Sequence, residues 1–170
     1  MKRLWVLRHA KSSWADEGIE DHDRPLAPRG ERAAVLIGAL LAQRDVRPDQ
    51  VLASTALRVR QTVERVLEQL PSPVPACFEP DLYLADADDW IDRLRALEDV
   101  DEVIVVGHNP GLEDLVAQLA PGGERSALRR LRDGLVTAAL AEIELDSKDW
   151  HGLRPHKGRL RSLSRPKDLV

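Results

Sequence analysis

The sequence predicts an α/β fold, a three-layer α/β/α sandwich on a mostly parallel sheet with an antiparallel edge. Short apolar runs alternate with helical patterns along most of the chain, which is typical of parallel strands covered by helices on both faces. Near the end, two apolar segments follow each other without a helix between them, which indicates at least one antiparallel strand. No linker long enough to divide domains interrupts the 170 residues, so residues 1–170 are expected to form a single domain.

Strands are predicted where short apolar runs occur. Three of these runs are expected to be buried, at residues 4–7, 51–53 and 103–106. Residues 135–145 and 158–163 are the two late strands. Residues 14–29 form one long loop, and long loops in compact domains are often functional.

Helices are predicted between these strands, at residues 31–43, 57–70 and 90–97, with a fourth between Pro110 and Pro121. Apolar residues in the first two recur at close to a 3.6-residue spacing. Arg29-Gly30 is expected to give the first helix a flexible entry. Asp86, Asp88 and Asp89 suit the N-terminus of the third, where negative charge is favourable.

The composition indicates a globular protein and argues against a membrane-spanning or nucleic-acid-binding one. An apolar fraction of 43% and a charged fraction of 32% are ordinary for a globular chain. No stretch approaches the roughly 18 apolar residues of a membrane span, so we expect a cytoplasmic protein without a membrane partner. The net charge of −4 and the lack of a recognised motif argue against nucleic acid as a partner. Cys77, the single cysteine, is expected to be structural.

The segment from Lys148 to Asp168 is basic, with seven Lys or Arg against two Asp. One interpretation is a charged, solvated edge that discourages pairing between sheets. The alternative is a docking surface for an acidic partner protein.

Cationic and imidazole side chains follow three predicted strands. The first strand leads into Arg8 and His9, the second towards Arg58, and the third into His108. Ligands of open α/β sheets bind beyond the carboxyl ends of the strands, so we expect these side chains at one rim. Each of these side chains is weak evidence by itself, because a histidine after a strand is more often structural. Their convergence at one rim indicates a functional site.

Two arginines and two histidines at one point suit phosphoryl transfer. The planar fork of arginine matches phosphate oxygens, and its charge repels divalent cations, which weakens the alternative of a histidine-based metal site. A neutral imidazole can attack phosphorus and form a covalent phosphohistidine. One ring nitrogen must then be unprotonated, and we expect a backbone carbonyl to hold the other.

The residues around His9 resemble a known family. Leu7-Arg8-His9-Ala10 is similar to the Arg-His-Gly signature of the histidine phosphatase superfamily, which includes the phosphoglycerate mutase-like enzymes. The resemblance sharpens towards the short SixA-like phosphohistidine phosphatases and covers nearly the whole chain. It is carried by Arg8–Ser12, Asp23–Leu26, Arg29–Gly30, Ser54–Arg58, Gln61–Thr62, Leu82–Ala85, Gly107–Pro110, Gly158–Leu160 and Arg165–Pro166.

The resemblance implies a phosphoglycerate mutase-like fold and a phosphatase that needs neither a metal nor another cofactor. It implies His9 as the nucleophile, with Arg8, Arg58 and His108 around the phosphoryl oxygens. Ala10 departs from the usual glycine and is expected to add a methyl group close to the phosphate.

Four further side chains near this rim are candidate ligands of the phosphate or the substrate, namely Lys11, Ser12, Arg24 and Asn109. For two of them a second interpretation stays open. Lys11 could equally lie in a solvated loop, and Arg24 could equally fix a loop through a salt bridge.

The class of substrate expected depends on whether the site contains a general acid for the leaving group. Small-molecule members of the superfamily carry a carboxylate that protonates the leaving oxygen, in an inserted segment that this chain lacks. General acids contribute typically about 10²–10⁴-fold, whereas a phosphorylated imidazole leaves more readily. The missing acid therefore favours phosphohistidine in a protein over a small phosphomonoester.

Two alternatives to this interpretation remain open. Glu79, Asp81, Asp86 and Asp88 are possible acids, although Asp86 and Asp88 are better explained as the start of a helix. A phosphate-binding module without turnover is an alternative of a different class, but pure binding does not need an imidazole nucleophile.

Overall fold

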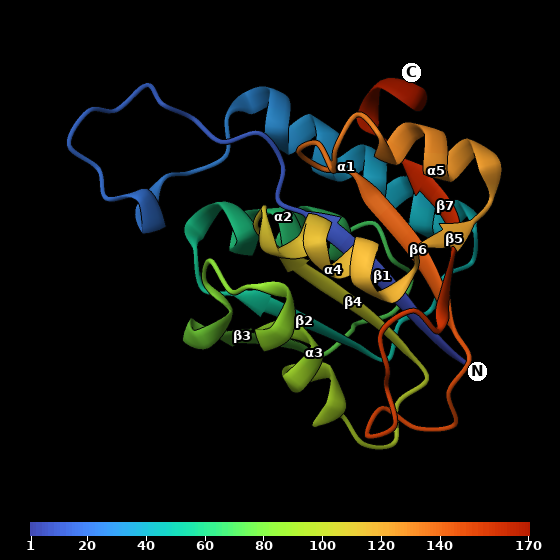
Figure 1. Ribbon diagram of the computed structural model, residues 1–170. Coiled ribbons are helices and arrows are strands. Elements are labelled where there is room, and N and C mark those ends of the chain that lie inside the picture. The colour runs from blue at the N-terminus through green and yellow to red at the C-terminus, as the bar shows by residue number, and fades with distance from the viewer.

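The computed structural model describes residues 1–170 and is built on one seven-stranded sheet with the strand order β3-β2-β4-β1-β6-β7-β5 (Figure 1). The strands are β1 Lys2–Arg8, β2 Gln50–Ser54, β3 Ala76–Glu79, β4 Glu102–Gly107, β5 Gly122–Gly123, β6 Leu140–Leu145 and β7 Gly158–Ser164. The α-helices are α1 Pro28–Gln43, α2 Leu57–Leu67, α3 Ala87–Arg95, α4 Gly111–Leu119 and α5 Arg125–Leu131. Short 3₁₀ helices are η1 Asp21–Asp23, η2 Pro80–Leu82 and η3 Pro166–Asp168. None of the helices combines the length and apolar composition needed to cross a membrane.

The sheet is mostly parallel, as the sequence predicts. Strand β1 pairs in parallel with β4, β4 with β2, and β2 with β3. Strand β6 pairs antiparallel with both β1 and β7, and β5 pairs in parallel with β7, so only β6 runs against the others. The antiparallel strand therefore lies inside the sheet, whereas an antiparallel edge was expected.

Helices cover both faces of the sheet, which confirms the three-layer α/β/α architecture. Successive residues of a strand point to opposite faces. Leu4 and Val6 of β1 lie in a core with α3, α4 and α5, whereas Trp5 and Leu7 lie in a second core with α1 and α2. In Figure 1, α4 crosses in front of the sheet and α2 lies behind it.

Two strands and one α-helix were not expected from the sequence, namely β3, the two-residue strand β5, and α5. Strand β3 lies at the edge of the sheet and its residues are only partly buried, so its apolar pattern is weak. Helix α5 is seven residues long and buries only Ala127, too little for a recognisable periodicity. Short elements at the margin of a core carry little hydrophobic signal.

The expectation for Gly30 was wrong. Helix α1 begins at Pro28, a favoured residue for the first helical position, and Gly30 is buried in its first turn. A Cβ atom there would overlap the backbone carbonyl of Lys11. Gly30 therefore serves close contact between α1 and the segment that follows β1, rather than flexibility.

The segment between β1 and α1 contains the long loop that the sequence predicts. Drawn in blue, it projects well beyond the sheet before it returns to α1 (Figure 1). Its 3₁₀ helix η1 packs near α2, where Asp21 contacts Arg58. The loop is thus attached to the body of the protein at the carboxyl ends of the strands.

Candidate active site

The eight side chains singled out in the sequence line one cavity of about 240 Å³. They are Arg8, His9, Lys11, Ser12, Arg24, Arg58, His108 and Asn109. Trp14, Leu84 and Thr137 complete the lining. The predicted convergence at the carboxyl ends of the strands is therefore present in the structure.

Sheet register brings the two histidines together. Arg8 of β1 is paired with Gly107 of β4, so the next residues, His9 and His108, leave neighbouring strands at the same level. The backbone N–H of His9 donates to the carbonyl of Gly107 over 3.1 Å. The two imidazole rings lie 5.4 Å apart between centroids, so one small ligand could contact both.

His9 is held in a single tautomer. Its Nδ1 lies 2.8 Å from the backbone carbonyl of Ala10, and because a carbonyl only accepts, Nδ1 must carry the hydrogen. Burial lowers the pKa of His9 to about 4, and the charge of Arg58 acts in the same direction. The ring is therefore neutral near pH 7, with an unprotonated Nε2, and the expected backbone carbonyl is present.

His108 is also a neutral imidazole, with the opposite tautomer. The Nη2 of Arg58 lies 3.3 Å from Nδ1 of His108, and since a guanidinium only donates, Nδ1 accepts. The Nε2–H then donates to the hydroxyl of Ser54 over 2.7 Å. Burial lowers the pKa of His108 to about 3, with a further contribution from His9.

Arg58 is oriented by the long loop. Its Nη1 donates to the backbone carbonyl of Asp21 over 2.7 Å, and its Nη2 lies 3.0 Å from the carboxylate of the same residue. That carboxylate also accepts hydrogen bonds from the Tyr83 hydroxyl and from Arg24. The bond from Tyr83, assisted by Arg58, lowers the pKa of Asp21 to about 2, so Asp21 is an anion at neutral pH.

Arg8 and Arg58 each retain an unused donor. Three buried side-chain nitrogens in the protein lack a hydrogen-bond partner, and two of them are the Nε atoms of these arginines. Buried donors are nearly always paired in proteins. Both arginines line the cavity, where their positive charge favours a bound oxyanion.

Arg24 and Ser12 bind each other at the rim. Arg24 is buried, donates to the Ser12 hydroxyl over 2.7 Å, and stacks on the Trp14 ring at 3.5 Å from its centroid. Arg24 therefore fixes the loop, as one of its two interpretations requires, while it also lines the cavity. Lys11 is exposed at the mouth and forms no salt bridge.

Asn109 and Ala10 have clear structural surroundings. The Asn109 amide donates to the Leu135 carbonyl over 2.7 Å and its oxygen accepts from the backbone of Glu113, so it holds the start of α4. Ala10 is fully buried in the core beneath α1 and α2 and does not line the cavity. The expectation that its methyl group lies close to the phosphate was wrong.

No carboxylate lines the cavity. Of the acids considered in the sequence, Glu79 is bound to Arg93 over 2.7 Å. Asp86 caps the N-terminus of α3 through the backbone N–H of Asp89, as predicted, and Asp88 lies in the first turn of that helix. Asp81 is exposed in η2, outside the cavity.

Asp21, Tyr83 and Thr62 were not anticipated as parts of the site. Thr62 accepts from the backbone N–H of Ala10 over 3.0 Å and donates to the carbonyl of Arg58 over 2.7 Å, which ties the segment after His9 to α2. The signals in the sequence were indirect. Asp21 lies in the long loop, and the other two lie in segments quoted for the family resemblance.

The chain is similar to a known family and to several known proteins. The model of the histidine phosphatase superfamily (branch 1) matches residues 4–90. Phosphohistidine phosphatase SixA of Escherichia coli is 31% identical over 147 residues, which are 85% of this chain and 86% of that protein. A candidate phosphohistidine phosphatase SixA from Agrobacterium tumefaciens has a similar structure, with a TM-score of 0.81, 32% identity, and 97% and 98% of the two chains covered. The protein histidine phosphatase SixA in complex with tungstate gives a TM-score of 0.80 at 28% identity, with 99% of each chain covered.

Proposed function

Because this chain belongs to the histidine phosphatase superfamily, we propose that it is a phosphatase that takes the phosphoryl group of a phosphohistidine in a protein onto His9 and then transfers it to water. The observation that carries the proposal is the neutral His9 ring, whose Nδ1–H is fixed by Ala10 so that Nε2 is the free nucleophile. The relatives named SixA support a protein substrate, and the tungstate complex of one of them supports an oxyanion in this cavity.

In the first step, Nε2 of His9 attacks phosphorus as the bond from phosphorus to the donor imidazole breaks. A donor protonated on its other ring nitrogen leaves as neutral imidazole, and His9 becomes a phosphoimidazolium with its Nδ1–H on the Ala10 carbonyl. Arg8, Arg58 and His108 would surround the phosphoryl oxygens and stabilise their charge in the transition state. Lys11, Ser12, Arg24 and Asn109 are proposed as the outer lining.

In the second step, water attacks the phosphoryl group on His9. The phosphorus–nitrogen bond breaks, His9 returns to the neutral imidazole, and both water protons leave with the product as dihydrogen phosphate. This step resembles the reverse of the first, with water in place of the donor imidazole. Neither step requires a carboxylic acid in the cavity.

The distribution of charge supports a mechanism without a metal ion. Arg8, Arg58, Arg24 and Lys11 line the cavity and no carboxylate does. Such surroundings favour an anion and disfavour a divalent cation. We therefore propose that the phosphatase is metal-independent.

A comparison of substrates tests the proposed class of donor. A phosphohistidine peptide is expected to have a kcat/KM at least about 10²-fold above that of an alkyl phosphomonoester such as glycerol phosphate, because an alkoxide needs a general acid. p-Nitrophenyl phosphate should fall between them, since nitrophenolate leaves without one. Equal values for the peptide and the alkyl ester would favour a small-molecule phosphomonoesterase. Binding of all three without hydrolysis would favour a phosphate-binding module.

The pH profile tests the state of His9. The reactive form is neutral and its pKa is about 4, so kcat/KM should be constant from neutral pH to about pH 5 and fall about tenfold per pH unit below pH 4. An unperturbed histidine would lose activity below about pH 6.5. The measurement is kcat/KM against pH, corrected for protonation of the substrate. A single break near pH 6.5 would contradict the assigned neutral state.

A further inference from the structure

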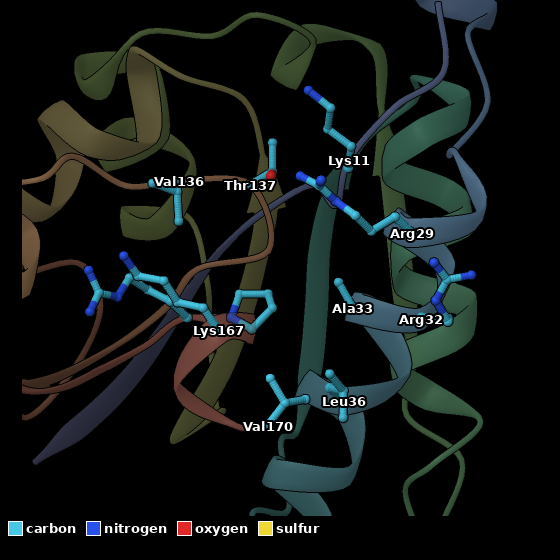
Figure 2. Close-up of a pocket in the computed structure, with 11 residues that line it drawn as sticks. Lys11, Arg29, Arg32, Ala33, Leu36, Val136, Thr137, Lys167 and Val170 are labelled. Atoms are coloured by element: carbon cyan, nitrogen blue, oxygen red, sulfur yellow. The ribbon is translucent and has the colours of Figure 1, made fainter. Parts of the chain in front are cut away.

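A second and larger cavity, of about 460 Å³, adjoins the phosphate cavity. We call it the basic groove. Figure 2 shows its two walls, with Arg29, Arg32 and Leu36 on α1 on one side and Val136 and Lys167 on the other. Neither step of the proposed phosphoryl transfer uses the basic groove, so the mechanism does not say which ligand the groove binds.

The basic groove has an excess of positive charge. Lys11, Arg29, Arg32, Arg165 and Lys167 line it and no carboxylate does. Arg165 is neutralised by Asp133 and Asp168, over 3.1 and 2.9 Å. The other four form no salt bridge. The groove is therefore a place of uncompensated positive charge.

Apolar side chains accompany the cations. Ala33 and Leu36 of α1, together with Val136, form part of the lining between the charged residues. The labelled cations stand on opposite walls and do not converge on one point (Figure 2). A second phosphate group would need converging donors, whereas spaced cations around apolar side chains suit a peptide that carries both carboxylates and apolar side chains.

The basic groove is continuous with the phosphate cavity. Lys11 and Thr137 line both, so a ligand whose phosphoryl group lies at His9 can extend into the groove. The surroundings also suit a protein-sized partner. Of the five large hydrophobic side chains that are exposed, Trp14 and Leu84 line the phosphate cavity and Val170 lines the groove. Apolar side chains gathered at one place on a surface mark interaction sites.

We propose that the basic groove binds an acidic segment of the phosphoprotein substrate, next to the phosphohistidine in that protein. This inference rests on the proposed function and adds the charge and location of the recognised sequence. Charge complementarity of this kind acts mainly on association and specificity. It would select among phosphohistidine proteins without changing the chemistry at His9.

The test uses the double variant Arg29→Glu/Arg32→Glu and two synthetic phosphohistidine peptides. In one the flanking residues are Glu and Leu, and in the other each Glu is replaced by Gln. Wild-type protein is expected to prefer the acidic peptide by about tenfold in kcat/KM, and the double variant should abolish this preference. Hydrolysis of phosphoramidate, which is too small to reach the groove, should stay within about twofold of wild type. Arg125→Glu, an exposed arginine on α5 without a salt bridge, is the matched control.

Two outcomes would overturn the inference while phosphatase activity persists. One is equal kcat/KM for both peptides in the wild type. The other is a double variant that loses activity only on small bisphosphorylated compounds. That result would mean that the groove binds a second phosphate group. If neither peptide is hydrolysed, fluorescence anisotropy with a labelled, unphosphorylated acidic peptide still tests the groove. Weaker binding to the double variant than to wild type would support it, and equal binding would refute it.

Discussion

Replacing His9 with alanine is expected to lower the rate of phosphohistidine hydrolysis by about 10⁵–10⁶-fold, the loss typical of removing a catalytic nucleophile. The reason is chemical, because no other side chain of the cavity offers an unprotonated nitrogen that is free of a hydrogen bond. Nδ1 of His108 accepts from Arg58 and its Nε2–H donates to Ser54. The measurement is single-turnover release of phosphate from a phosphohistidine peptide.

The control for His9→Ala is His151→Ala, which removes an exposed histidine that does not line the cavity and should retain wild-type activity. Thermal unfolding of both variants checks that the fold is kept. Added imidazole should partly restore activity to His9→Ala, since the cavity left by the ring can admit it. More than about 1% residual activity without imidazole would mean that another group carries the phosphoryl transfer.

Replacing Arg58 with alanine is expected to lower kcat/KM by about 10³-fold, the scale seen when a preorganised donor to the transition state is removed. Arg58 lines the cavity with an unpaired Nε–H, and its Nη2 contacts His108. Lysine keeps the charge without the planar fork, so Arg58→Lys should recover only part of the loss. The measurements are kcat/KM for the peptide and the inhibition constant of inorganic phosphate.

A structural effect of Arg58→Ala must be separated from a catalytic one, because Arg58 also holds the loop through Asp21. Asp21→Asn weakens that attachment but keeps the guanidinium. It should reduce kcat/KM by no more than about tenfold, since it alters only the positioning of Arg58. Equal losses in Arg58→Ala and Asp21→Asn would mean that Arg58 acts by holding the loop.

The sequence predicts those site residues whose positions are set by the ends of the strands. Short apolar runs followed by Arg8-His9 and by His108 indicate where parallel strands finish, and parallel strands finish at one edge. The register of β1 on β4 then makes His9 and His108 neighbours. Arg58 follows from the same logic, because it lies in the first turn of the helix after β2.

The contacts that orient these residues depend on tertiary structure. Asp21 and Tyr83 are far apart in the sequence, and no local spacing relates either of them to Arg58. The basic groove is also assembled from distant segments, α1 and the end of the chain. For the basic C-terminal segment, the sequence left open a solvated charged edge or a docking surface for an acidic partner. In the structure, different residues of the segment have different surroundings. Arg161 pairs with Glu144 over 2.9 Å at the sheet, whereas Lys167 lines the groove without a salt bridge.

Direct detection of the covalent intermediate is the most direct test of phosphoryl transfer to His9. Protein mixed with phosphoramidate and quenched in alkali within milliseconds is expected to carry phosphate on Nε2 of His9. Peptide mass spectrometry locates the residue, and ³¹P NMR identifies the nitrogen. The label should be acid-labile and base-stable, should form equally in the presence of EDTA, and should be absent from His9→Ala. Phosphate on another residue, or labelling undiminished in His9→Ala, would contradict the role of His9 as nucleophile.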